Sequence, residues 1–241
     1  MSEKHLSSQF DSDLNGVSSQ LMEMGGLVET QIQRAMQSLA NFSTTLADEV
    51  VHAEDRVDAM EVTIDRALSS IVARRQPAAR DLRLLLAISK ITTNLERAGD
   101  EAQKIARKVK SIVESGEARD MPIGDLRVAA DLASSLIRRA LDAFARLDVA
   151  VAVSIVKEDD LIDREFKGFT RKLITYMMED PRTISDSLDL LFIAKAVERI
   201  GDHAKNIAEY VIYITWGADV RHRPLAEIEA ALRENQAEDL S

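Results

Sequence analysis

The chain has 241 residues, of which 46% are hydrophobic and 30% charged, and this is the composition of a folded protein rather than a disordered one. Its net charge of −10 argues against nucleic acid as a partner, because neutralising phosphates requires a basic surface. The absence of cysteine excludes disulfides and thiolate chemistry, and it fits the cytoplasm, where we expect the protein to act. We expect neither a signal peptide nor a membrane span, since long apolar runs are missing.

The sparse breakers divide the chain into long segments with a helical apolar period. Leu84, Ile88 and Ile91, for example, are separated by four and three residues, which is typical of helices packed lengthwise. We expect helices over residues 10–42, 45–75, 79–115, 123–147, 149–179 and 183–217. A further short helix is predicted over residues 225–234 of the C-terminal tail.

The two halves of the chain repeat one another. IQRAMQSL and IRRALDAF are 105 residues apart, as are EDRVD and DDLID, while ERAGDEA and ERIGDHA are 102 residues apart. The order of the three matches is the same, so we predict an all-α fold of two tandem, duplicated three-helix bundles packed as an elongated six-helix protein. The bundles are assigned to residues 1–118 and 119–217, followed by an acidic, partly mobile tail over 218–241.

Each half carries acid pairs four residues apart on its second and third helices. With the apolar seam facing the core, we place these acids on the outward side, where like charges at this spacing destabilise a helix by roughly 0.2–0.5 kcal/mol. If the two helices pack side by side, the pairs line a groove that a cation would neutralise. The candidate metal ligands are Glu54, Asp58, Glu96 and Asp100 in the first bundle and Asp159, Asp163, Glu198 and Asp202 in the second.

The donor types restrict the class of cation. Oxygen-rich sets suit divalent ions such as Mg²⁺, Ca²⁺ and Mn²⁺, or ferric iron. His203 could add a nitrogen ligand to the second site, whereas the first half has Glu101 at that place. Phe166 stands where the first half has Glu61, so we expect the two sites to be unequal.

The acid pairs also fit two different roles. They could be solvated on a structural scaffold, with Arg56, Arg97 and Arg199 as countercharges, or the protein could bind or store metal. Gly99 and Gly201 each cost roughly 1 kcal/mol in a helix interior, which favours close helix packing or a nearby ligand. We expect no catalytic residues, because nucleophile, phosphate-loop and dinucleotide motifs are missing and the chain lacks the two core-facing Glu-x-x-His motifs of a di-iron oxidase.

Taken together, ERAGDEA, ERIGDHA, EDRVD and DDLID resemble the motifs of the PhoU family of bacterial phosphate-uptake regulators. HLSSQFDSDLNGV and FIAKAVERIGDHAKNIAE are also similar to that family, and the resemblance extends from Phe10 to Trp216. It implies metal ions at the acid pairs and a non-enzymatic, homodimeric adaptor in the cytoplasm.

The same resemblance implies partners for the adaptor. These are the ATPase PstB of the phosphate-specific ABC transporter and the sensor kinase PhoR, and the protein would reach the membrane only peripherally through them. When phosphate is plentiful, it would restrain uptake and keep the phosphate-starvation regulon repressed.

Overall fold

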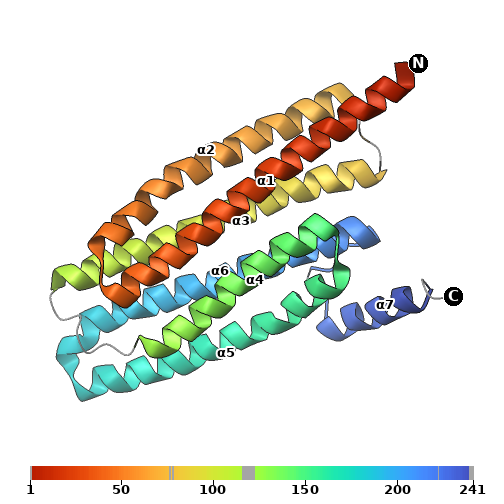
Figure 1. Ribbon diagram of the computed structural model, residues 1–241. Helices are drawn as coiled ribbons and strands as arrows, with labels where there is room; N and C mark the ends of the chain where they lie inside the picture. Colours follow the sequence, from red (N-terminus) through yellow and green to blue (C-terminus); the bar gives the residue numbers. More distant parts are fainter. Residues whose placement is uncertain (1, 76, 78, 116–122, 222, 239–241) are drawn as a thin grey trace.

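The structure is a computed structural model that describes residues 2–75, 77, 79–115, 123–221 and 223–238. It is helical throughout, with no strand among the described residues, so the all-α prediction is confirmed (Figure 1). The helices are α1 (Ser2–Asn41), α2 (Thr44–Arg75), α3 (Ala79–Ser115), α4 (Gly124–Arg146), α5 (Val149–Glu179), α6 (Ile184–Trp216) and α7 (Leu225–Glu238).

Local sequence signals explain where several helices begin and end. The side chain of Asp148 caps α5 by accepting a hydrogen bond from the Val151 backbone N–H at 3.0 Å. Gly217 ends α6 with a φ of 72°, a left-handed conformation that glycine adopts without strain. α1 begins earlier than the predicted residue 10, since no glycine or proline interrupts the segment before it. The predicted boundary between residues 118 and 119 lies outside the described residues.

The helices form two three-helix bundles that meet along α3 and α6. α2 and α5 lie at the two outer edges, whereas α3 and α6 run antiparallel through the middle (Figure 1). Lys108 of α3 binds Asp189 of α6 at 2.8 Å, and Arg199 of α6 binds Glu101 of α3 at 3.2 Å. As the residue number rises from Glu101 to Lys108 in α3, the number of the partner falls from Arg199 to Asp189 in α6, which is the pattern of an antiparallel pair.

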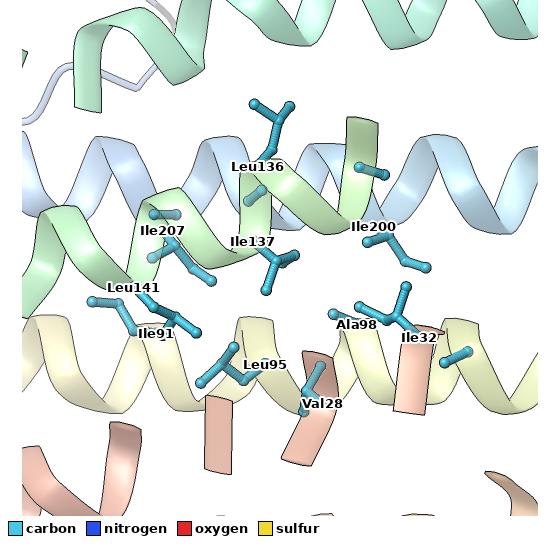
Figure 2. Packing of buried hydrophobic residues seen from close by; sticks show 14 of the residues in the cluster. Val28, Ile32, Ile91, Leu95, Ala98, Leu136, Ile137, Leu141, Ile200 and Ile207 are labelled. Carbon is cyan, nitrogen blue, oxygen red and sulfur yellow. The ribbon is translucent and has the colours of Figure 1, made fainter. Parts of the chain in front are cut away.

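The two bundles share one hydrophobic core. Buried side chains of α1, α3, α4 and α6, including Val28, Leu95, Ile137 and Ile200, converge between the bundles (Figure 2). Gly25 of α1 makes room for α4, because a Cβ at this position would lie 2.5 Å from a methyl group of Leu141. The close approach of α1 and α4 therefore depends on the absence of a side chain at Gly25.

The described part of the C-terminal tail forms α7 against α5. Ile228 is buried, and Lys157 of α5 forms an ion pair with Glu229 at 3.2 Å. The predicted helix starting at Leu225 is confirmed, although it continues to Glu238. None of the described helices combines the length and apolarity that crossing a membrane requires.

Candidate functional site: two acidic clusters

The first acidic cluster consists of carboxylates that α2 and α3 bring close together. Burial raises the pKa of Glu54 to about 7, the hydrogen bond from Gln31 opposes this rise, and the charges of Asp58, Asp100 and Glu96 add to it. The four predicted ligands of the first bundle are therefore close enough to act on one another. Each helix contributes two of them, as the i, i+4 spacing predicts.

Glu61 is a fifth member of this cluster. Burial raises its pKa, Asp65 adds to the rise, and a hydrogen bond from Thr93 at 3.5 Å opposes it. Glu61 and Asp100 in turn contribute to the raised pKa of Glu96, after burial. The signal for Glu61 was present in the sequence, since it follows Asp58 by three residues on the same face of α2.

Gln31 of α1 also belongs to the first cluster, although the sequence pattern did not predict it there. Its side chain is buried, and its Nε2 donates to the backbone oxygen of Val50 at 3.3 Å and, in a short hydrogen bond, to Glu54 Oε2. A polar residue in the apolar seam between Val28 and Ile32 was the available signal. Gln31 therefore connects α1 to the acids of α2 and α3.

Gly99 has a specific role beside these groups. A Cβ at Gly99 would lie 3.0 Å from Gln31 Oε1 and 3.1 and 3.2 Å from the two carboxylate oxygens of Glu54. Gly201 has a different neighbour, because its Cβ would lie 2.5 Å from a methyl group of Ile162. Close packing therefore explains Gly201, whereas Gly99 leaves room for polar oxygens.

The second acidic cluster consists of Asp159, Asp163, Glu198 and Asp202, from α5 and α6. Burial raises the pKa of Asp202 to about 6, the charges of Glu198 and Asp159 add to the rise, and Lys195 opposes it. Lys195 binds Glu198 at 2.6 Å, and Lys205 binds Asp159 at 2.9 Å. Two lysines thus neutralise part of this cluster from within the fold.

The prediction that all eight acids face outward is wrong for two of them. Glu54 and Asp159 are only 3% and 5% exposed. Both lie on the outer pair of helices and point at the neighbouring inner helix near its glycine, where the missing side chain leaves space. The helical period correctly separated the apolar seam from the acids, but it could not locate the adjacent helix.

The suggestion that His203 contributes to the second cluster is not supported by its position. Its Nδ1 lies 3.1 Å from Asn94 Oδ1 on α3, so the ring faces the contact between the bundles. Burial lowers the pKa of His203 to about 4, which keeps the imidazole neutral at pH 7. Glu101 lies in the same contact, bound by Lys104 at 2.9 Å and by Arg199. His203 and Glu101 line a groove of about 800 Å³ between the two acidic clusters.

The three arginines proposed as countercharges have different partners. Arg56 binds Glu23 of α1, and Arg199 binds Glu101, so both form ion pairs with acids outside the predicted ligand set. The charge of Arg97 opposes the rise in the pKa of Glu61 and Glu96 that burial causes, and thus acts on the first cluster.

Carboxylate oxygens are the donor type that a hard cation prefers, but the present positions of these side chains do not form a coordination site. Within the described residues, no three Asp, Glu, His or Cys side chains are arranged to hold a metal ion as they stand. Two buried oxygens of the first cluster, Gln31 Oε1 and Glu54 Oε1, nevertheless have no hydrogen-bond partner. Unpaired buried acceptors of this kind are uncommon, and a cation would satisfy them.

Comparisons with known proteins agree with the duplicated architecture. The PhoU domain matches residues 21–109 and again residues 126–211. The chain is 50% identical over 223 residues to a phosphate-specific transport system accessory protein PhoU homolog of Burkholderia sp, covering 92% of this chain and 95% of that protein. It is 43% identical over 220 residues to the Escherichia coli (strain K12) phosphate-specific transport system accessory protein PhoU, covering 91% and 90%.

Solved structures show the same fold. The crystal structure of PhoU from Pseudomonas aeruginosa matches with a TM-score of 0.84 and 45% identity, covering 87% of this chain and 100% of that one. A phosphate transport system regulatory protein PhoU from Streptococcus pneumoniae matches with a TM-score of 0.81 and 25% identity, covering 88% and 99%. The six-helix arrangement is therefore shared across distant sequences.

Proposed function

Because the chain belongs to the PhoU family, we propose that it is a non-enzymatic regulator of phosphate uptake and phosphate homeostasis. It couples the phosphate ABC transporter to the sensor kinase, and it represses the phosphate-starvation regulon when phosphate is plentiful. The names of its relatives, which are accessory proteins of phosphate-specific transport, carry this proposal. The protein acts as a homodimer in the cytoplasm, and it contacts the membrane only through its partners.

An adaptor needs a surface for its partners, and one end of the second bundle offers such a surface. Ile184, Leu188 and Phe192 are exposed at four-residue intervals along α6, and Ile174 and Met178 are exposed near the end of α5. Exposed apolar side chains at one end of a bundle are candidates for protein–protein contacts. We define these five residues as the α5–α6 apolar patch.

The residues beside this patch are charged. Lys167 and Arg171 are exposed on α5, one to two turns before Ile174. Glu179, beside Met178, is exposed as well, so the border carries both signs of charge and suits an apolar surface with charged neighbours of both signs. We assign the patch to the transporter ATPase PstB, and a second contact elsewhere on the protein serves the sensor kinase PhoR.

A deletion strain tests the regulatory role. Without the gene, phosphate-starvation genes are expected to be expressed in high phosphate, and the wild-type gene supplied in trans restores repression. Normal repression in the deletion strain would contradict the proposal. Capture of purified PstB and of the PhoR cytoplasmic region by the purified protein tests the two partners separately.

Cation binding is the second proposed activity, and the unpartnered buried oxygens of the first acidic cluster support it. Divalent or ferric ions suit the carboxylates of both clusters by charge and donor type. Elemental analysis of the purified protein, before and after treatment with a chelator, tests this activity. Protein that carries no metal and gains none on addition would leave the acids as a structural feature.

A further inference from the structure

The groove between the two acidic clusters is more basic than the chain as a whole. Six basic and five acidic residues line it, although the net charge of the chain is −10. Arg97 of α3 and Arg199 of α6 are both in this lining, and they occupy equivalent positions of the two repeats, 102 residues apart. Because α3 and α6 pack against each other, each repeat contributes one arginine to the same groove.

Three cations of the groove gather around one buried carboxylate. Glu101 is 5% exposed, and its Oε1 accepts from Lys104 Nζ at 2.9 Å and from Arg199 at 3.2 Å. Arg97 precedes Glu101 by one helical turn, and its side chain forms no hydrogen bond with any of the described residues. After burial, all three positive charges contribute to the lowered pKa of His203, so they lie near its ring. A single carboxylate therefore leaves N–H groups of these cations available to an anion.

The hydrogen bonds of His203 determine which of its ring nitrogens is an acceptor. Asn94 Nδ2 donates to the backbone oxygen of Lys90 at 2.8 Å, so Asn94 Oδ1 is the acceptor in its other two contacts. These contacts are with Asn206 Nδ2 and His203 Nδ1, each at 3.1 Å. Nδ1 of the neutral ring therefore carries the proton, and Nε2 has the lone pair. Nε2 has no hydrogen-bond partner in the described part of the chain.

We propose that this groove binds inorganic phosphate through Arg97, Lys104 and Arg199, with His203 Nε2 as a hydrogen-bond acceptor. Ammonium and guanidinium groups donate to phosphate oxygens, and arginine does so with pairs of N–H groups. At pH 8 inorganic phosphate keeps one proton, and its P–O–H group donates to Nε2 of the neutral imidazole. Sulfate and phosphate monoesters have no proton to donate at this pH, so their oxygens would meet the lone pair and bind more weakly.

Other cations of the groove already have acidic partners. Lys205 binds Asp159 at 2.9 Å, and Arg221 binds Asp219 at 2.5 Å. The three cations around Glu101 are therefore the part of the lining where positive charge exceeds the charge of its partners.

The acids of the lining limit the size of the anion. Asp100 lies 4.0 Å from Lys104 Nζ, and Asp160 and Glu209 also line the groove. These carboxylates would repel the additional charges of a polyphosphate, because like charges brought together oppose binding. A single phosphate is thus a better match than a longer anion, although the groove is large enough for both.

Calorimetric titration of the purified full chain with sodium phosphate, at pH 8 and constant ionic strength, tests the site. We expect one saturable equivalent per chain, bound about tenfold more tightly than sulfate or adenosine monophosphate, the scale of one hydrogen bond to a charged group. Absence of saturable phosphate binding up to about 10 mM would overturn the proposal. Equal or tighter binding of adenosine monophosphate would identify a nucleotide as the ligand in place of inorganic phosphate, and equal binding of sulfate would exclude the hydrogen bond to Nε2.

Arg97→Gln tests the cationic part of the site. Because its side chain forms no hydrogen bond with the described residues, the variant is expected to fold and to bind phosphate about tenfold more weakly. Arg66→Gln is the matched control, since Arg66 is exposed on α2 outside the groove and its replacement removes the same charge. Unchanged affinity in Arg97→Gln, or an equal loss in both variants, would contradict the assignment.

His203→Phe tests the acceptor. Phenylalanine keeps a ring at this position but has no lone pair, so the preference for phosphate over sulfate should disappear while the cations still bind both anions. A preference that persists in the folded variant would exclude His203 as the acceptor.

Circular dichroism and thermal unfolding verify that the variants are folded. If His203→Phe fails to fold, the comparison of phosphate with sulfate in the wild-type protein still decides whether Nε2 contributes. All of these measurements use purified protein, so a failure of phosphate binding is distinct from a failure of the regulatory role, which the deletion strain tests.

Discussion

Lys205 Nζ lies 2.9 Å from Asp159 Oδ2, whereas the equivalent positions in the first half hold Gln103 and Glu54. The buried carboxylate is thus paired with an ammonium group in one repeat and with the amide of Gln31 in the other. This difference determines how each cluster responds to substitution, pH and added ions.

Removing Lys205 is expected to destabilise the second bundle. In Lys205→Ala, the buried carboxylate of Asp159 loses its cation, and the free energy of unfolding should fall by about 1–2 kcal/mol, a value reduced for the partial exposure of the lysine. Urea unfolding of chelator-treated protein measures this, and added Mn²⁺ should recover part of the loss. Lys157→Ala is the control, because Lys157, which pairs with Glu229, is mostly exposed. An equal loss in both variants would contradict the prediction.

The stability that Glu54 contributes without metal is expected to be lost as the pH rises from about 5 to 8. The pKa of Glu54 is raised from 4.5 to about 7, so the folded state holds a proton that the unfolded state has released in this range. Asp202, with a pKa raised from 3.8 to about 6, acts in the same direction at lower pH. Each pKa unit corresponds to about 1.4 kcal/mol, so Glu54 contributes roughly 2–3 kcal/mol of this change.

Urea unfolding at several pH values measures this dependence. Glu54→Gln should flatten the part between pH 5 and 7, because the amide does not titrate. The lowered pKa of His203 acts in the opposite direction in both proteins, so the comparison isolates Glu54. The same pH dependence in Glu54→Gln and the wild-type protein would contradict the raised pKa of Glu54.

Adjacent glycines in α1 are expected to respond in opposite directions. Gly26→Ala meets nothing within 4 Å and should stabilise the protein by about 0.5–1 kcal/mol through helix propensity. Gly25→Ala would place its Cβ against Leu141, which must move and disturb the contact between α1 and α4. Thermal unfolding of the two single variants measures the difference. Equal stabilisation by both would show that this contact is not tightly packed.

Polar substitutions in the α5–α6 apolar patch are expected to weaken partner binding without unfolding the protein. Leu188→Ser and Phe192→Ser remove exposed apolar area, so the melting temperature should change little while the affinity for PstB falls. Val62→Ser, at an exposed position of α2, is the control. Surface plasmon resonance with purified PstB measures the affinity, and equal binding by all variants would place the contact elsewhere.

The helices and the grouping of the acids could be predicted from the sequence. The residues of other helices that contact the acids could not. The helical period located α3 at its observed bounds because breakers flank a long apolar seam. The two acid pairs of each bundle meet because helices adjacent in sequence also pack side by side. Gln31 and Lys205 could not be assigned, since their partners depend on how one helix is rotated against the next, which a single apolar period does not specify.

The shared core has a consequence for the origin of the fold. A single repeat would expose the apolar surfaces of α1 and α3 that now lie against α4 and α6. An ancestral chain with one repeat would therefore need a second copy of itself, with two α3 helices antiparallel across a twofold axis. Fusion of two such copies would make the pair one molecule, in which each acidic cluster is free to diverge.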